Sequence, residues 1–320
     1  MIHSFTVTNH TGKSMECELT NPWKEGLAVG SIDGLGPGQA TVNVADISSK
    51  DGGLFNSARK GPRNIVITLI FVDHDTLTIE DLRRKCYTYF PLKKQVKLKF
   101  TTSDGKTYKH YLIDGVVESN EPTIFSQREG TTISILCPDP CFYTTDDQEQ
   151  RFSVASNPAF TFEFSKVPSN NDELLMGVVV PYIVANLYYD GDSDTGAIFD
   201  ITFKTDVEHT PSNPKKIRID NSLTNTSSMF SLEKIKNIVS TMVEDFQGIV
   251  AGDRIILSTI VGEKTLTYIH NGTSYNVLGA IESTGSWLTI AKGLNYLVID
   301  KDGSIEITAS VKNKICYYGV

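Results

Sequence analysis

Cys137 and Cys141, four positions apart around a Pro-Asp-Pro core, have residue types that suit metal or thiol chemistry. A structural zinc site needs four ligands, and the remaining cysteines and six histidines offer no second pair at suitable spacing. A redox pair is spaced Cys-x-x-Cys at the start of a helix, whereas two prolines stiffen this turn and no helical pattern follows. We therefore expect no metal site, and we interpret both cysteines as small apolar residues at a strand end.

Other segments contain residues that could bind phosphate or calcium or catalyse a reaction, but none has the complete sequence motif for that role. The glycine-dense segment 30–38 matches no phosphate-binding motif and is expected to be a loop. The acidic segment 190–194 lacks the glycine and the distal glutamate of a calcium loop, and Asp-His-Asp at 73–75 fits a surface turn. No nucleophile elbow, zinc-protease motif or Cys-His signature occurs. We predict no catalytic residue and no cofactor, which favours a binding or structural protein.

Length and charge favour two domains of different character. A chain of 320 residues is too long for one comfortable core. Residues 1–143 hold sixteen basic and sixteen acidic side chains, so the net charge of −8 lies in residues 144–320. An acidic surplus argues against nucleic-acid binding. No apolar run of membrane-spanning length and no secretion signal occurs, so we expect no membrane contact and assembly in a cytoplasm.

The secondary-structure signals are mainly β. Three pairs of segments read as hairpins around Asp-Gly or Asn-Gly turns, which favours antiparallel sheets in both halves of the chain. The three expected hairpins pair 96–100 with 108–113, 265–269 with 274–277, and 297–300 with 304–308.

Two helices interrupt the strands. The first is expected over 78–90, with Thr78 as N-cap, Asp81 three residues later and Pro91 as the stop. The second is expected over 231–246, where apolar residues recur at helical spacing and indicate core packing.

The strand at 65–72, Ile-Val-Ile-Thr-Leu-Ile-Phe-Val, is apolar on both faces, which is typical of a strand covered on two sides. The helix that follows is the simpler cover, and a neighbouring subunit is the alternative.

Several segments in chain order resemble the distal tail protein family of long-tailed bacteriophages. The strand ending in Cys-Pro-Asp-Pro comes about 140 residues into the chain, as in that family. The other matching segments are Arg59–Arg63 before the apolar strand, the helix with its Phe-Pro stop, the strand at 97–100, Ser212–Asn221, Ala251–Leu257, Trp287–Asn295 and the C-terminal Tyr317–Val320. Lys292, Leu294 and the helix at 231–246 depart from the family pattern.

The resemblance implies a mainly β fold with an N-terminal ring-forming domain, residues 1–143, that contains one helix. It implies a C-terminal galectin-like β-sandwich, residues 144–320, with an extra helix. The implied function is structural: a homohexameric hub at the virion tail tip that joins the tail tube protein to the tail-tip protein and to receptor-binding proteins. The alternative is a carbohydrate-binding adhesin that uses the sandwich, although fold likeness alone does not make a sugar site.

Two groups of residues are predicted to carry these roles. The uncharged first half and its apolar strand are expected to meet neighbouring copies. The predicted subunit interface consists of Arg59, Lys60, Arg63, Ile65, Ile67 and Phe71. The residues expected to stack on a sugar, if the sandwich binds one, are Tyr275 and Trp287.

Overall fold

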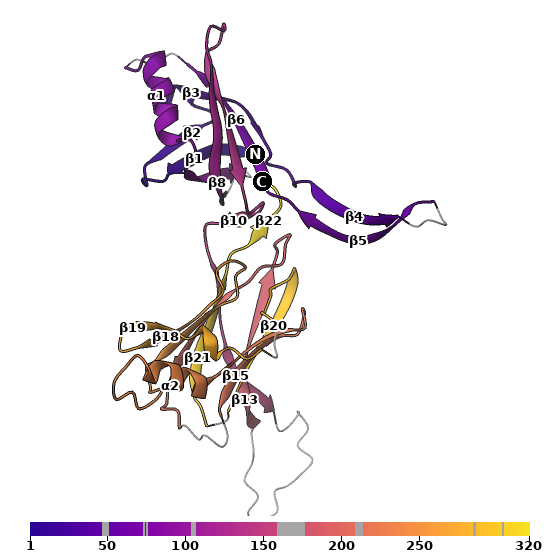
Figure 1. Ribbon diagram of the computed structural model, residues 1–320, viewed down its shortest axis with the longest axis vertical. Coiled ribbons are helices and arrows are strands. Elements are labelled where there is room, and N and C mark those ends of the chain that lie inside the picture. Colours follow the sequence, from indigo (N-terminus) through magenta and orange to yellow (C-terminus); the bar gives the residue numbers. More distant parts are fainter. Residues whose placement is uncertain are drawn as a thin grey trace, which may run out of the picture. The chain divides into compact units, whose positions relative to one another are not determined.

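The computed structural model describes residues 1–46, 51–72, 74, 76–103, 107–158, 177–208, 214–283, 286–302 and 304–320. The chain forms two compact units (Figure 1). Unit 1 comprises Met1–Asp146 together with Cys316–Val320, and unit 2 comprises Asp147–Ile315. The division was predicted at residue 143, with the last five residues in the second domain, whereas Cys316–Val320 belong to unit 1.

Unit 1 is built on one nine-stranded antiparallel sheet. The strands are β1 (Ile2–Asn9), β2 (Ser14–Glu18), β3 (Leu27–Asp33), β6 (Arg63–Phe71), β7 (Gln95–Ser103), β8 (Tyr108–Thr123), β9 (Gly130–Cys137), β10 (Phe142–Thr144) and β22 (Cys316–Tyr317). Their order is β2-β1-β7-β8-β9-β6-β3, with β10 beside β8 and β22 beside β10. The predicted pairing of the segments in β7 and β8 is confirmed, while the turn between them lies outside the described residues.

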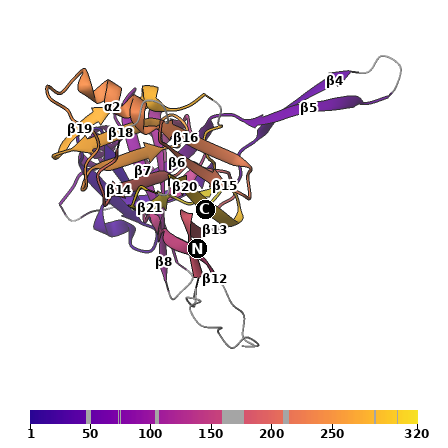
Figure 2. The same ribbon diagram turned by 90° about the horizontal axis from the view of Figure 1, so that it is seen from below.

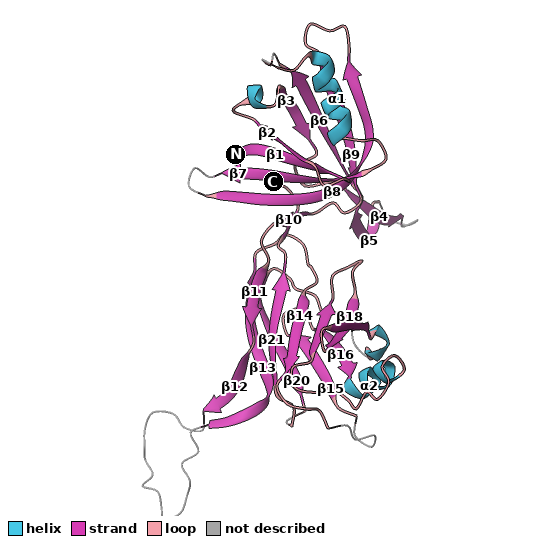
Figure 3. Cartoon of the chain, turned by 90° about the vertical axis from the view of Figure 1, so that its left-hand side faces the viewer, coloured by secondary structure: helices cyan, strands magenta, loops and turns pink. Residues whose placement is uncertain are grey.

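Helix α1 (Ile79–Tyr89) packs against β1, β6 and β9 (Figure 3). Its N-cap is the predicted one, because the Thr78 hydroxyl accepts from the Asp81 N–H and the Asp81 carboxylate accepts from the Thr78 N–H. The buried side chains Leu82 and Cys86 join the core of unit 1. A short 3-10 helix, Pro22–Lys24, lies between β2 and β3.

The apolar strand is buried on one face only. Ile65, Ile67 and Leu69 on β6 are fully buried in the same core as the helix side chains. Val66 and Ile70, on the opposite face, are half-buried. The helix therefore covers one face as predicted, and the second face is partly open within the protomer.

A separate two-stranded hairpin also belongs to unit 1. It consists of β4 (Ala40–Asp46) and β5 (Gly53–Lys60), which pair only with each other (Figure 2). Both strands expose almost all their side chains.

Unit 2 contains two antiparallel sheets around one apolar core. The six-stranded sheet has the order β11-β21-β14-β17-β18-β19, and the five-stranded sheet has the order β12-β13-β20-β15-β16. The strands are β11 (Gln148–Arg151), β12 (Ser153–Pro158), β13 (Gly177–Tyr189), β14 (Ile198–Phe203), β15 (Lys216–Asn221), β16 (Thr226–Ser231), β17 (Arg254–Ser258), β18 (Thr265–His270), β19 (Thr273–Asn276), β20 (Gly293–Lys301) and β21 (Ile307–Asn313). The mainly β fold class is confirmed, and the likeness of unit 2 to galectins stays a prediction.

The second hairpin is confirmed, because β18 pairs with β19 around Asn271 and Gly272, both with positive φ. The third expected hairpin is wrong. β20 belongs to the five-stranded sheet and β21 to the six-stranded sheet, so these segments do not pair. The turn at Asp302 reverses the chain, but the fully buried Ile305 enters the core and carries β21 across to the other sheet.

Helix α2 (Leu232–Ser240) is shorter than the predicted span. Ser231 is its N-cap and accepts from the Lys234 N–H. The helix ends where the Ser240 and Thr241 hydroxyls donate to carbonyls of the last turn, which competes with continued helix. Met242, predicted to lie in the apolar stripe, is 56 % exposed. A 3-10 helix, Leu278–Ala280, packs near α2, and among the described residues no helix has the length and apolarity to cross a membrane.

Candidate functional site

The β4–β5 hairpin is amphipathic, because cross-strand partners point to the same face of a two-stranded ladder. One face carries the pairs Val42–Ala58 and Val44–Phe55. Val42, Val44 and Phe55 are 54 %, 51 % and 63 % exposed, so this apolar face is open to solvent in the protomer.

The opposite face of the hairpin carries two polar pairs, Thr41–Arg59 and Asn43–Ser57, and one apolar pair, Ala45–Leu54. An isolated two-stranded ribbon is marginally stable in water. A long hairpin with one apolar face therefore fits a segment that another surface covers.

Arg63, the first residue of β6, fastens the base of this hairpin. It is 5 % exposed, and its guanidinium group donates to four backbone carbonyls at 2.6–2.9 Å. The acceptors are the carbonyl oxygens of Gly34, Gly36, Pro140 and Tyr318. Burial lowers the pKa of Arg63 from its ordinary value, and the donors in their fixed fork satisfy carbonyls from three separate segments.

The loop before the hairpin is shaped to meet this arginine. Gly34 has a φ of +88°, and a Cβ at this position would overlap the Asn64 carbonyl oxygen. Only glycine suits such a backbone at so close an approach. Residues 34–38 of the glycine-dense segment form the predicted turning loop and present carbonyls to Arg63, whereas Gly30–Asp33 belong to β3.

The C-terminal segment, Cys316–Val320, holds both ends of the hairpin. The Val320 N–H donates to the Leu35 carbonyl at 3.1 Å, ahead of β4. At the end of β5, the buried ammonium of Lys60 has no hydrogen-bond acceptor among the described residues and lies over the Tyr318 ring. A cation over a ring face is attracted by the ring quadrupole.

The Pro-Asp-Pro turn lies inside unit 1 and is held by the Asp139 carboxylate. Asp139 accepts from the Cys141 N–H at 3.0 Å and from the Tyr143 hydroxyl at 2.7 Å, which closes the turn. Burial, followed by the hydrogen bond to Asp139, raises the pKa of Tyr143. No group of three potential metal ligands occurs among the described residues, and burial raises the pKa of Cys137 to about 12.

The predicted interface residues divide into two sets. Arg59 is exposed on the polar face of the hairpin, and Lys60 and Phe71 are half-buried. Arg63, Ile65 and Ile67 lie inside unit 1, which corrects the prediction that they contact a neighbouring subunit. The arginine is committed to carbonyls of its own chain, and the two isoleucines are fully buried, because alternation along β6 turns them to the core.

The two aromatics predicted to stack on a sugar are both half-buried and pack against the core of unit 2. The Lys264 ammonium lies 4.9 Å from the centre of the Trp287 ring. The Tyr275 ring lies 6.5 Å from that of Tyr268. Their contacts are those of core aromatics, and sugar binding stays a prediction.

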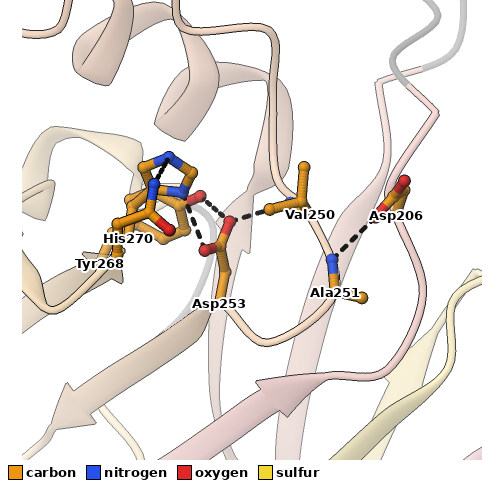
Figure 4. Close-up of polar contacts among 7 residues, drawn as sticks. Asp206, Val250, Ala251, Asp253, Tyr268 and His270 are labelled. Atoms are coloured by element: carbon orange, nitrogen blue, oxygen red, sulfur yellow. Dashed lines mark hydrogen bonds and ion pairs between the residues drawn. The ribbon is translucent and has the colours of Figure 1, made fainter.

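A buried polar cluster in unit 2 was not singled out from the sequence (Figure 4). The Asp253 carboxylate is almost fully buried and accepts from the Tyr268 hydroxyl, from the Val250 N–H and from His270 Nδ1, the last two at 2.9 Å. Burial, then the hydrogen bond to Asp253, raises the pKa of Tyr268, so its phenol stays protonated. The cluster anchors the turn before β17 to β18. In the sequence, this cluster could have been found from the Gly252-Asp253 turn and from the alternation of Tyr268 and His270 on one face of β18.

Comparison with known proteins identifies the type of domain to which most of unit 1 is similar. Residues 11–133 match the family model of the phage tail protein RIFT-related domain. Unit 1 contains a phage tail domain. This phage tail domain includes the hairpin, Arg63 and α1, and no protein of curated function matches the sequence.

The fold of the whole chain is similar to solved structures of phage tail proteins. One is the SPP1 Dit (gp 19.1) protein, described as a paradigm of the hub adsorption apparatus in phages that infect Gram-positive bacteria. It shares 14 % identity with a TM-score of 0.60, over 97 % of this chain and 99 % of that chain. The predicted resemblance to distal tail proteins is confirmed by the phage tail domain and this shared fold.

Chains of the phage P2 baseplate, in its activated conformation, have the same fold. The structure with Ca gives a TM-score of 0.50 and 14 % identity over 98 % of both chains. The structure with Sr gives a TM-score of 0.50 and 13 % identity over 97 % of both chains.

Proposed function

We propose that the protein is a structural hub at the distal end of a phage tail, which joins the tail tube to the host-recognition apparatus and performs no catalysis. The phage tail domain supports a tail component, and the SPP1 protein with the same fold is described as a hub. The buried polar cluster around Asp253 is a structural anchor, which agrees with a protein that assembles rather than reacts.

The copies of the protein form a ring of six, and the β4–β5 hairpin makes the contact between neighbours. The observation that carries this proposal is the apolar face of Val42, Val44 and Phe55, which the protomer leaves exposed. The hairpin of one copy packs on a different surface of the next, so the interface is heterologous. Repeated heterologous contacts close into a ring when the rotation allows it.

Burial of the apolar face stabilises the ring more than charge pairing does. Each aliphatic or aromatic side chain that leaves water contributes about 1.5–3 kcal/mol. The exposed Arg59 on the polar face forms at most a rim pair worth about 0.2–1 kcal/mol. The arginine therefore guides register, and the apolar face holds the neighbour.

The ring presents equivalent sites to the tail tube protein on one side and to the tail-tip protein on the other. The acidic excess lies beyond residue 143, and unit 2 therefore offers its surface to solvent or to receptor-binding proteins. These partners place the protein at the virion tail tip, after assembly in the host cytoplasm.

The test compares two valine variants of the full chain. Val44→Asp places a charge on the apolar face of the hairpin, and Val261→Asp is the matched control on an 81 % exposed residue of unit 2. Light scattering across a wide concentration range, with and without isolated tail tubes, reports the oligomer, and negative-stain images report the ring. We expect rings from the wild type and the control, and monomers from Val44→Asp.

A wild-type protein that stays monomeric at high concentration and in the presence of tail tubes contradicts the ring. Rings from Val44→Asp at the wild-type concentration would instead exclude the hairpin as the contact. Hydrolysis of cell-wall material by the purified protein would exclude the non-catalytic role.

A further inference from the structure

The chain leaves unit 1 after Asp146 and returns at Cys316, and its two passages pair with each other. β10 and β22 form a short antiparallel ladder in which Phe142 faces Tyr317 and Tyr143 faces Cys316. Side chains two positions apart on a strand share a face, so Cys141, directly before β10, lies on the side of the ladder that carries Cys316.

The two thiols are in contact. Cys141 and Cys316 are 9 % and 2 % exposed, and a hydrogen bond joins their side chains. Both thiols also lie in the field of the same two charged groups, Asp139 and Lys60. The register of the ladder, the shared neighbours and the thiol contact therefore bring these two sulfur atoms together from positions far apart in the sequence.

The two thiols differ in acidity. The hydrogen bond from Cys316 lowers the pKa of Cys141, and the same bond raises the pKa of Cys316. Cys141 is thus the thiol that ionises first, and a thiolate is the form that attacks a disulfide.

The other three cysteines are less suited to this reaction. The Cys137 thiol donates to the Ile135 carbonyl and is fully buried. Cys17 and Cys86 are fully buried in the core of unit 1, and burial raises the pKa of each to about 12.

We propose that Cys141 and Cys316 form a disulfide bond when the folded protein meets a small-molecule disulfide such as oxidised glutathione. The Cys141 thiolate attacks one sulfur of the oxidant, which forms a mixed disulfide and releases one glutathione thiolate. Cys316 then loses its proton and attacks Cys141 Sγ, which releases the second glutathione. Two protein thiols are oxidised, and one oxidised glutathione is reduced to two molecules of glutathione.

The bond would fasten the C-terminal segment that holds the hairpin. Tyr318 and Val320, two and four residues after Cys316, contact the two ends of the hairpin through Lys60, Arg63 and Leu35. β22, the strand in this segment, comprises two residues and pairs with β10 over those two residues, so only a short ladder holds it. A covalent link to the Pro-Asp-Pro turn would keep this segment in place outside a reducing cytoplasm.

The test uses the full-length protein with oxidised glutathione under native conditions. Free thiols are then blocked with N-ethylmaleimide in denaturant, and the digest is analysed by mass spectrometry. We expect a linked peptide that contains Cys141 and Cys316 and disappears on reduction, with the other three cysteines alkylated. Cys141→Ser and Cys316→Ser should each lose the linked peptide, and Cys137→Ser should keep it.

Hydrogen exchange provides a second measurement on the wild type. Oxidation should slow the exchange of residues 316–320 and of β5, and dithiothreitol should restore it. A stable glutathione adduct on Cys141 without the linked peptide would overturn the proposal, and so would a bond between Cys137 and Cys141. The linked peptide joins two cysteines of one chain, so its detection is independent of ring formation.

Discussion

Replacement of Arg63 by alanine should unfold unit 1 at a lower temperature than any surface substitution. The change removes four hydrogen bonds from a buried guanidinium to carbonyls of the loop at 34–36, the Pro-Asp-Pro turn and the C-terminal segment. A hydrogen bond contributes about 1 kcal/mol net once the burial cost of the donor is included, so we expect a loss of about 4 kcal/mol. For a domain of this size that loss lowers the Tm by about 10 °C.

Scanning calorimetry of the full chain measures the effect, because the two units have separate cores and the second transition serves as an internal reference. Arg59→Ala removes a cation of the same type from the exposed hairpin surface and should shift the free energy of unfolding by less than about 0.5 kcal/mol. Arg63→Lys keeps the charge but has its donors on one atom, so it should recover only part of the loss. If Arg63→Ala melts like Arg59→Ala, the argument that this residue joins the three segments is wrong.

Three further outcomes are expected. The hydrogen bond from Thr78 lowers the pKa of Asp81 from its ordinary value of 3.8. The ionised carboxylate therefore stabilises α1 above that pH, and the stabilisation is lost as the pH falls through the folded-state pKa. The free energies of unfolding of Asp81→Ala and wild type, measured in urea, should converge in acid. Tyr268→Phe removes one donor from the buried Asp253 carboxylate and should destabilise unit 2 by about 1–3 kcal/mol in calorimetry, with no change in unit 1. Because burial raises the pKa of Cys86 to about 12, iodoacetamide at pH 8 should leave it unmodified in the native protein by mass spectrometry, and alkylation before unfolding would contradict that burial.

Short-range signals in the sequence were sufficient for several elements. The capping box at Thr78 and the proline after Phe90 act within one helical turn, so the first helix was predictable almost to the residue. The Asn-Gly turn at 271–272 and the alternation on either side specify the β18–β19 hairpin in the same way.

Where local signals competed with distant contacts, the prediction failed. The turn at Asp302 resembles a hairpin turn, but the buried Ile305 directs the chain into the opposite sheet. The apolar spacing of 231–246 favours one long helix, yet side-chain hydroxyls at Ser240 and Thr241 end it after residue 240.

The mainly β class, the presence of two domains and the likeness to phage tail proteins were predictable from the sequence alone, because periodicity, turns and motif order are local or colinear properties. Which side chains reach the surface depends instead on contacts between segments that are far apart in the sequence. Arg63 was predicted to face a neighbour, and its four acceptors come from positions 34, 36, 140 and 318. The exposed apolar face on Val42, Val44 and Phe55 was likewise decided by tertiary structure, because no sheet of the protomer covers the hairpin that carries it.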